Sequence, residues 1–328
     1  MQTVDVIIVG GGPAGSSCAW QLKRHNVDCL ILDKATFPRT KLCAGWITPE
    51  VVDDLEIDIK QYPHRFLTFD DLKFHFPLLS IRTASVQHSI RRYEFDAWLL
   101  ERSGAKIIEH NVRDIQYTNN EYIIDGQYRS RYLIGAGGTR CPVYRQLFRD
   151  ANPRPKTLQA VTLEEEFAYD YPDPQCHLWF FKNGLPGYAW YVPKADGYIN
   201  VGIGGMAQKL KNNNDDIKPH WQQFIKHLAK TGLITKHSYQ PKGYSYFIRD
   251  KVEQTRIDNA FIIGDAAGLA TRDMCEGIGP AVKSGLFAAN SIIHNRPYNL
   301  ETIAKYSSHS FFVQKLMEYK FHRIKPNP

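Results

Sequence analysis

The sequence predicts an α/β protein in which a Rossmann-like domain with a parallel sheet is interrupted by a domain built on an antiparallel sheet. Two apolar, β-branched runs, VDVIIVG near the start and NAFIIGDAAG near the end, each lead into a glycine-rich turn, as buried parallel strands do. Between them lie aromatic segments separated by Asn183-Gly184 and Asp196-Gly197, and such dipeptides are typical of hairpins.

Length and composition limit the classes of function. The 328 residues exceed one typical domain, and the 43% hydrophobic content is that of a globular protein. The net charge of +7 is spread along the chain. This favours anionic ligands or peripheral contact with a membrane surface, and indicates no nucleic-acid-binding arm. No feature of the sequence indicates an oligomeric state.

The cysteines and the start of the chain favour a cytoplasmic protein. The six cysteines are scattered without a CxxC pair. Neither they nor His177 and His237 have the spacing of metal ligands, so we expect no metal. Free thiols are typical of a reducing compartment. The first strand begins by Val4, which leaves no room for a signal peptide, and no run of about 18 apolar residues is present.

The first glycine turn predicts a dinucleotide site. Gly10, Gly12 and Gly15 form a GxGxxG motif between a strand and a helix, and a second strand ends in Asp33. Such glycines allow a tight turn and a close approach of backbone to pyrophosphate, while the helix N-terminus attracts phosphate. The alternative, a glycine turn that only packs a helix on a sheet, does not explain the acid that ends the second strand.

The second glycine turn indicates which dinucleotide binds. Gly264 and Asp265 precede a helix that starts near Gly277. In many flavoproteins these two turns close around one FAD, with the aspartate on the ribityl hydroxyls. The helix end carries about half a positive charge, which suits reduced flavin. We therefore expect FAD, with NAD(P)H as a transient electron donor, since no second GxGxxG lies between a strand and a helix. The alternative is a buried strand ending in a capped turn.

Further residues are expected around FAD. Arg92 stands at a helix start, four residues before Asp96, where it either reaches a phosphate or remains a surface arginine. The set expected to bind FAD is Gly10, Gly12, Pro13, Ala14, Gly15, Asp33, Lys34, Arg39, Cys43, Ala44, Arg92, Val112, Gly264, Asp265, Gly277, Ile278 and Gly279.

The middle of the chain predicts an antiparallel sheet that forms a substrate chamber. Aromatic residues crowd its strands, and we expect Tyr188, Trp190 and Tyr191 to line a pocket for a hydrophobic small molecule. The alternative for them is plain core. Lys194 is expected to be a hairpin lysine, and the alternative for it is an anchor for an anion. We place the FAD-binding domain at 1–60, 88–155 and 252–300, the substrate domain at 61–87 and 156–251, and a helical tail at 301–328.

Four segments together resemble the geranylgeranyl reductase-like branch of FAD-dependent oxidoreductases, which is related to the aromatic-hydroxylase flavoproteins. They are GGGPAG, FPRTKLCAGWITPEVVDDL, GYAWYVPKADGYINVGIG and GDAAG with the later EGI. The second is similar to that branch's K-x-C-G-G segment and the third to its Y-x-W-x-F-P-K strand. The resemblance implies a Rossmann-like FAD-binding domain with an inserted antiparallel-sheet substrate domain.

The resemblance also implies candidate catalytic residues. Cys43 matches a cysteine that lies near the flavin in that branch and would donate a proton or bind a reactive substrate. Cys275 stands where the branch has glycine, and Arg272 where it has proline. The alternative for both cysteines is a small buried hydrophobe, as free cysteines usually are. The chain also ends before the large C-terminal lobe of some prenyl reductases, and Gly137 to Cys141 lack the acid of the hydroxylase branch.

These observations leave three classes of function open. We expect an oxidoreductase that uses flavin hydride to reduce C=C bonds of a hydrophobic substrate, with isoprenoids as a candidate class. An FAD-dependent monooxygenase or halogenase is the first alternative, because Tyr188-x-Trp190-x-Val192-Pro193 is similar to the halogenase W-x-W-x-I-P motif. A non-catalytic FAD-binding redox protein is the second.

Overall fold

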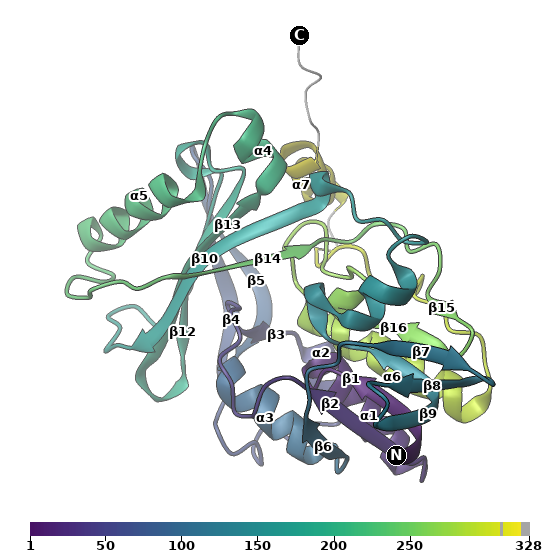
Figure 1. Cartoon of the computed structure of the whole chain (residues 1–328). Helices are drawn as coiled ribbons and strands as arrows, with labels where there is room; N and C mark the ends of the chain where they lie inside the picture. Colours follow the sequence, from purple (N-terminus) through teal and green to yellow (C-terminus); the bar gives the residue numbers. More distant parts are fainter. Residues whose placement is uncertain (309–310, 323–328) are drawn as a thin grey trace. The chain divides into compact units, whose positions relative to one another are not determined.

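The computed structural model describes residues 1–308 and 311–322. Within them the chain forms two compact units, each assembled from separate segments of sequence (Figure 1). Unit 1 contains residues 1–39, 93–154 and 247–308, and unit 2 contains residues 40–92, 155–246 and 311–322. Residues 40–60, which we expected with the FAD-binding domain, pack in unit 2.

Unit 1 is built on a mainly parallel sheet, as the sequence predicts. The strand β1 (Gln2–Val9) lies between β2 (Cys29–Asp33) and β9 (Tyr128–Gly135), and both neighbours run parallel to it. Its residues Val6 to Val9 are buried in the core, as expected for a strand covered on both faces. The sheet is completed by β6 (Lys106–Glu109), β7 (Ile115–Thr118), β8 (Glu121–Ile124), β15 (Arg256–Ile257) and β16 (Ala260–Ile262).

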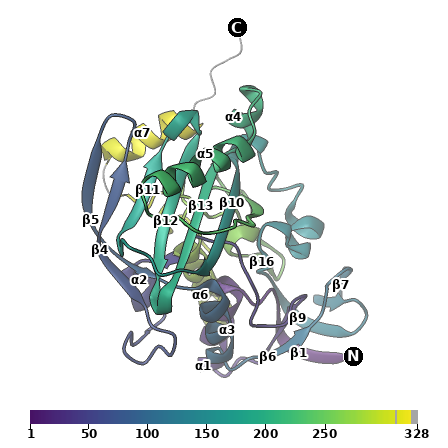
Figure 2. The same cartoon turned by 90° about the vertical axis from the view of Figure 1, so that its left-hand side faces the viewer.

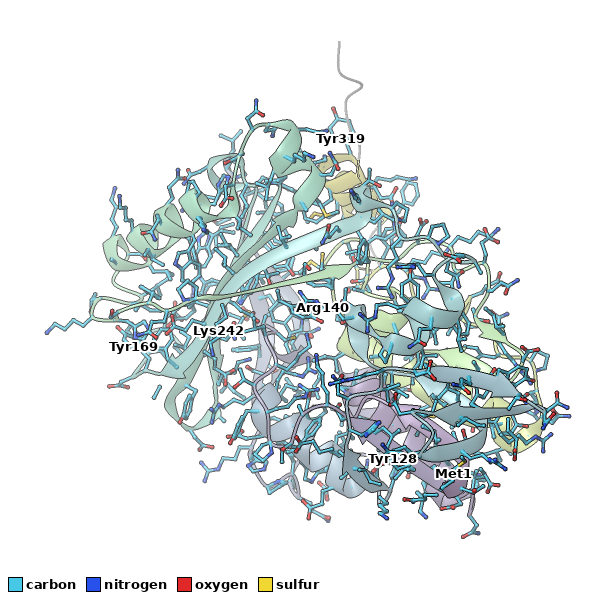
Figure 3. The ribbon with its side chains drawn as sticks, viewed as in Figure 1. Met1, Tyr128, Arg140, Tyr169, Lys242 and Tyr319 are labelled. Atoms are coloured by element: carbon cyan, nitrogen blue, oxygen red, sulfur yellow. The ribbon has the colours of Figure 1, made fainter. Side chains whose placement is uncertain are left out.

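Two helices of unit 1 follow the two glycine turns and pack against each other. They are α1 (Pro13–Arg24) and α6 (Ile278–His294). A Cβ atom at Gly285 would lie 2.3 Å from the Ala14 carbonyl oxygen, so glycine is required for the helices to approach this closely. The helix α3 (Arg92–Arg102) begins at the end of unit 2 and continues in unit 1. The short helices are η1 (Gly138–Arg140), η2 (Tyr144–Phe148) and η6 (Gly264–Ala266). Arg140, the last residue of η1, is labelled in Figure 3.

Unit 2 is built on a second sheet of mainly antiparallel strands, which confirms the predicted fold class. Its order is β14-β10-β13-β12-β11-β4-β5-β3. The two predicted turns are present, between β11 and β12 and between β12 and β13. The strands are β3 (Trp46–Ile47), β4 (Leu67–His75), β5 (Ser80–Ser89), β10 (Gln159–Ala168), β11 (Cys176–Phe180), β12 (Gly187–Lys194), β13 (Tyr198–Met206) and β14 (Lys242–Phe247).

A long amphipathic helix covers one face of the second sheet (Figure 2). This helix, α5 (Ile217–Lys230), buries Trp221, Phe224 and Leu228 against Val201 and Ile203 of β13, and its apolar stripe has the predicted helical spacing. Unit 2 also contains α2 (Pro49–Asp54), α4 (Ala207–Asn212), α7 (Phe311–His322), η3 (Lys156–Leu158), η4 (Lys182–Gly184) and η5 (Ala195–Gly197). Residues 323–328 of the predicted tail lie outside the described residues. Among the described helices, none is long and apolar enough to cross a membrane.

Candidate active site

The first glycine turn of unit 1 has the geometry of a phosphate-binding loop. A Cβ atom at Gly10 would lie 2.4 Å from the Ala136 carbonyl oxygen, and one at Gly15 would lie 1.9 Å from the Gly10 carbonyl oxygen. Gly12 precedes α1 without any capping side chain. The first amides of α1 therefore keep the unpaired donors of a helix N-terminus, which suit an anion.

Two charged residues lie beside this turn. The Asp33 carboxylate accepts hydrogen bonds from the backbone N–H groups of Gly11 (2.7 Å) and Ala35 (2.9 Å), which fix it at the end of β2. Arg39 forms an ion pair with buried Asp96 (3.3 Å), and one of its terminal nitrogens lies 3.5 Å from where a Gly12 Cβ would stand. The arginine is thus held next to the backbone that would face a pyrophosphate.

The second glycine turn lies directly against the first. A Cβ atom at Gly264 would lie 3.1 Å from the Ala14 Cβ, and the Gly264 N–H donates to Ser284 Oγ (2.9 Å). The Asp265 carboxylate points toward the start of α6, where its Oδ1 is 3.4 Å from the Cβ position of Gly277. No hydrogen bond to this carboxylate is made within residues 1–308 and 311–322. The two turns therefore lie side by side in unit 1.

Cys43 and Ala44 lie in unit 2, in a loop that two side chains hold against the second sheet. Lys194 at the end of β12 donates to the Ala44 carbonyl oxygen and to the Gly45 carbonyl oxygen (2.7 Å). Asn200 on β13 donates to the Cys43 carbonyl oxygen (3.2 Å). The side chain of Lys194 is fully buried, and this burial lowers its pKa to about 8. Lys194 therefore lies at the hairpin, as expected, but it is buried and holds the Cys43 loop.

Tyr188, Trp190 and Tyr191 do not share one face of the sheet. Trp190 and Tyr188 lie on the face away from α5, where the Trp190 indole donates to Asn200 Oδ1 (2.7 Å). Tyr191 lies in the apolar cluster under α5, and its hydroxyl donates to the Asp173 carbonyl oxygen (3.0 Å). Because side chains alternate along a strand, only the first two belong to the same surface as Lys194 and Asn200. We leave Tyr191 out of the proposed pocket.

The sequence and structure comparisons point to one family. Residues 8–78 match the family model of an NAD(P)-binding Rossmann-like domain. An uncharacterized protein of Methanosarcina barkeri is 31% identical over 307 residues, covering 89% of this chain and 75% of that protein. Digeranylgeranylglycerophospholipid reductase 2 of Methanosphaera stadtmanae is 25% identical over 333 residues, covering 94% and 83%. Menaquinone reductase of Mycobacterium tuberculosis is 26% identical over 314 residues, covering 88% and 76%.

Solved structures show the same fold. A geranylgeranyl bacteriochlorophyll reductase-like protein from Thermoplasma acidophilum superposes with a TM-score of 0.77 at 20% identity, covering 98% of this chain and 85% of that one. The flavin-dependent halogenase CmlS superposes with a TM-score of 0.72 at 19% identity, covering 98% and 63%. The chain belongs to the geranylgeranyl reductase-like family of FAD-dependent oxidoreductases. The predicted family and enzyme class are therefore confirmed.

The residues of unit 1 fit the FAD of this family. The uncapped amides after Gly12 and the guanidinium of Arg39 suit the pyrophosphate, and the carboxylate of Asp33 suits ribose hydroxyls. The carboxylate of Asp265 makes no hydrogen bond within the described residues, so both of its oxygens remain available to hydroxyl donors. Of the other residues expected to bind FAD, Lys34 is exposed next to Asp33, Val112 is buried in the core of unit 1, and Arg92 is buried at the start of α3.

Cys275 occupies a backbone position that favours glycine. Its φ is 55°, in the left-handed region, which costs a non-glycine residue about 1 kcal/mol. This explains physically why the family resemblance leads us to expect glycine there. The next residue, Glu276, accepts a hydrogen bond from the Gly279 N–H (3.2 Å) and so caps α6. Arg272 donates to the Arg249 carbonyl oxygen (2.8 Å).

Sequence reasoning did not find Arg154, which holds the second glycine turn. Its guanidinium donates to the carbonyl oxygens of Thr139 (2.7 Å) and Ala266 (2.5 Å) and stacks on the Tyr144 ring (3.5 Å). It therefore connects η1 with the Gly-Asp turn within unit 1. The residue follows a proline in an irregular segment, NPRP, where no periodic pattern distinguishes it from a surface arginine.

Proposed function

We propose that this oxidoreductase reduces C=C bonds of a hydrophobic, isoprenoid substrate, with NAD(P)H as the transient electron donor. One observation carries the proposal: the sheet face away from α5 presents Tyr188 and Trp190 beside the held Cys43 loop. Both side chains are largely buried, at 8% and 4% exposure, and aromatic rings of this kind would contact an apolar chain through dispersion. The names of two relatives, a digeranylgeranylglycerophospholipid reductase and a menaquinone reductase, support a substrate of this class.

The chain's own residues have distinct roles in this proposal. FAD, when bound, supplies the hydride. The turn at Gly10 to Gly15 and Arg39 hold its pyrophosphate, and Asp33 and Asp265 hold its hydroxyls. Tyr188 and Trp190 orient the apolar substrate, and Lys194 with Asn200 keeps the Cys43 loop in place. Cys43 and Cys275 are the candidate catalytic thiols.

An anaerobic single-turnover experiment tests the reaction. The purified enzyme is reduced with NADPH or NADH, mixed with a digeranylgeranylglycerophospholipid in detergent, and the lipid is analysed by mass spectrometry. We expect flavin reoxidation together with the gain of two hydrogen atoms per reduced double bond. Reoxidation that requires oxygen and yields a hydroxylated or halogenated product would instead identify a monooxygenase or halogenase. A flavin that no donor reduces would identify a non-catalytic redox protein.

A separate variant tests the cofactor site. Asp265→Ala removes two acceptor oxygens and should weaken FAD binding about 5- to 30-fold, since each hydrogen bond contributes about 1 kcal/mol net. Isothermal titration of the apoprotein with FAD measures the change. The exposed Asp250 of the same unit gives a matched control, Asp250→Ala, which should bind FAD as the wild type does. Equal affinity of the Asp265 variant and the wild type would contradict the assignment.

We also propose that the enzyme meets its substrate through peripheral contact with a membrane. The turn between β4 and β5 contains Leu78 and Leu79, which are 99% and 60% exposed. Aliphatic side chains at a protruding tip insert readily among lipid headgroups, and the net charge of +7 favours anionic lipid. Co-flotation with anionic vesicles should decrease strongly in the double variant Leu78→Ser with Leu79→Ser. Unchanged flotation would remove this tip from the contact.

A further inference from the structure

Three consecutive glutamates on β10 have different surroundings. Glu165 points to the α5 side, where it accepts hydrogen bonds from His237 (3.0 Å) and from the Gln240 N–H (2.6 Å). Glu166 points to the other side and pairs with Arg91 (2.9 Å). Glu164 shares a face with Glu166, but its Oε1 is buried and makes no hydrogen bond within the described part of the chain. This exception needs a physical explanation, because an unpaired buried polar group is costly.

The strand register places Glu164 beside Trp190. Gly202 of β13 lies opposite both residues. A Cβ atom at Gly202 would lie 2.2 Å from the Trp190 ring and 2.7 Å from the Glu164 Cβ. The missing side chain at Gly202 therefore lets the indole and the carboxyl meet on one face. This is the face on which the proposed function places the substrate.

The charges around Glu164 come from three further parts of unit 2. Burial raises the pKa of Glu164 to about 8, and Glu166 acts in the same direction, while Lys41, Lys194 and Arg92 act against it. Lys41 itself lies 3.4 Å from the centroid of the Tyr244 ring. At neutral pH the carboxyl group is accordingly protonated. Lys41 and Lys194 would stabilise its anion.

We propose that Glu164 is the acid that donates a proton to the substrate in the reduction of its double bond. The inference rests on the proposed function. FAD held by the turns of unit 1 would, once reduced, supply a hydride to one carbon of the double bond. The electron pair of the double bond forms a new C–H bond at the other carbon with the proton of the Glu164 carboxyl. The step would leave the saturated bond, a flavin oxidised by loss of the hydride, and the Glu164 carboxylate, which solvent would reprotonate.

The proposal explains the features that the fold does not require. The O–H group of a protonated Glu164 carboxyl donates to no described residue, so a ligand on this face would accept its hydrogen bond. Cys43 is the competing proton source, since its thiol lies in the loop held by Lys194 and Asn200. Its sulfur accepts a hydrogen bond from the Gly45 N–H (3.4 Å), and its S–H remains a donor, so the second test below includes Cys43→Ser.

The first test measures protonation without any substrate. Infrared difference spectra of wild type minus Glu164→Gln should show the C=O stretch of a protonated carboxylic acid at pH 6, and the band should disappear by pH 10. Absence of the band at pH 6 would overturn the proposal.

Thermal unfolding gives a second readout. A raised folded pKa stabilises the protein fully below the unfolded pKa of about 4.5 and loses that effect as the pH rises through about 8. The melting temperature of Glu164→Gln relative to wild type should therefore increase from pH 5 to pH 8.

The second test follows proton delivery in a single turnover. Each variant is reduced with dithionite and mixed anaerobically with the same digeranylgeranylglycerophospholipid. Flavin reoxidation in Glu164→Gln should be slowed about 100-fold or more, as expected for loss of a general acid, with FAD affinity unchanged. Glu165→Gln is the matched control and should react as the wild type does. Reoxidation of Glu164→Gln at the wild-type rate, or slowing only in Cys43→Ser, would overturn the proposal.

The two tests separate this inference from the proposed function. A wild-type enzyme that never reduces the lipid contradicts the reductase assignment. The infrared band then decides whether Glu164 still carries a proton, and its absence would overturn the inference by itself. A wild-type enzyme that turns over, combined with an unaffected Glu164→Gln, leaves the reductase assignment standing and removes only Glu164.

Discussion

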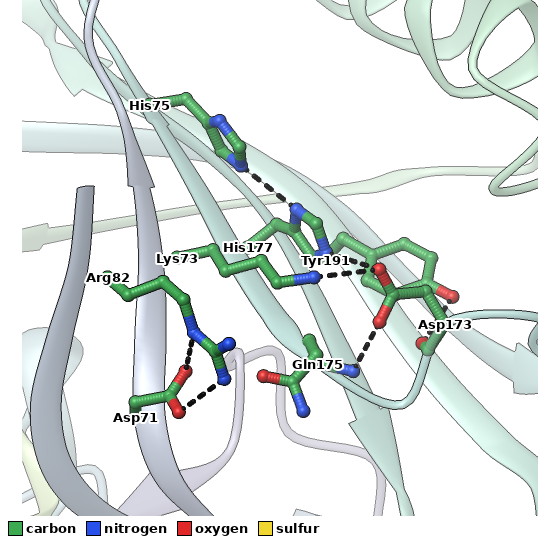
Figure 4. Close-up of polar contacts among 8 residues, drawn as sticks. All are labelled: Asp71, Lys73, His75, Arg82, Asp173, Gln175, His177 and Tyr191. Carbon is green, nitrogen blue, oxygen red and sulfur yellow. Dashed lines mark hydrogen bonds and ion pairs between the residues drawn. The ribbon is translucent and has the colours of Figure 1, made fainter. Parts of the chain in front are cut away.

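Two carboxyl groups on opposite faces of the second sheet, Asp173 and Glu164, have different surroundings. On the α5 face, His177 Nε2 donates to the Asp173 carboxylate (3.0 Å), and its Nδ1 meets His75 Nε2 (2.9 Å), as Figure 4 shows. Lys73 binds the same carboxylate (3.1 Å), and His75 Nδ1 meets Ser80 Oγ (2.9 Å). On the opposite face, Glu164 has a buried oxygen without such a partner.

The difference separates a hydrogen-bonded network that stabilises the fold from a carboxyl group that is available for chemistry. Proton positions in the His network follow from the chain of partners. The Asp173 carboxylate accepts from His177, so the second nitrogen of neutral His177 accepts from His75, which in turn accepts from Ser80. Each ring nitrogen of His75 and His177 therefore has a hydrogen-bond partner, and the network stabilises the fold. Burial and nearby cationic groups lower the pKa of His75 to about 4, which keeps it neutral at physiological pH.

The largest expected effect comes from breaking the apolar part of the α5 face. Phe224→Ala removes a ring that is 4% exposed and packs on Trp179. The cavity should lower the free energy of unfolding by about 3–5 kcal/mol. Urea denaturation measures the loss, and Phe224→Leu should recover more than half of it. A loss below about 1 kcal/mol would show that α5 does not depend on this contact.

A somewhat smaller effect is expected on the opposite face. Lys194→Met leaves the Ala44 and Gly45 carbonyl oxygens without their donor, which should cost about 2–4 kcal/mol. The loop should also loosen, so that the Cys43 thiol reacts faster with an aromatic disulfide reagent. The exposed lysine at the start of β14, labelled in Figure 3, supplies the control Lys242→Met. Unchanged thiol reactivity would mean that Asn200 alone holds the loop.

The smallest effect sharpens the contrast between the two polar groups. Asp173→Asn should cost only about 1 kcal/mol at pH 7, because the side chain of Asp173 is partly exposed. Burial opposes ionisation of Asp173, but the Gln175 N–H, Lys73 and His177 outweigh it and hold its pKa below the ordinary value of 3.8. A lowered pKa stabilises the fold above pH 3.8 and loses this effect as the pH falls through the folded value. The deficit of the variant should therefore shrink below pH 4, and a deficit that is constant down to pH 3 would contradict the charge argument.

Much of unit 1 could be predicted from sequence because its signals are local. The order strand, GxGxxG, helix, strand and acid specifies a phosphate loop, and the later Gly-Asp turn adds a second element. What the sequence does not contain is the contact between Gly264 and Ala14, which depends on the order of strands in the sheet. Whether those two turns meet had to be inferred from the family resemblance.

Unit 2 was less predictable because its key partners are distant in sequence. Alternation along β10 indicates that Glu164 and Glu166 share a face, but not which of them has a partner. Arg91 and His237, the partners of its neighbours, come from segments far from β10. Lys194 lies next to an Asp-Gly turn, which is typical of an exposed position. It is buried because the carbonyl groups of a loop about 150 residues earlier need a donor.

The assembly of unit 1 from three segments determines when this chain can fold during its synthesis. α1 is made first, but the helix that packs on it, α6, ends at His294. The intervening segments belong largely to unit 2. The first strands of unit 2 cannot complete their sheet until β10 to β13 have been synthesised. For most of translation the apolar side of α1 therefore has no partner on the emerging chain. Nascent chains that expose such surfaces need protection from aggregation, so this flavoprotein should depend on chaperones until its last third leaves the ribosome.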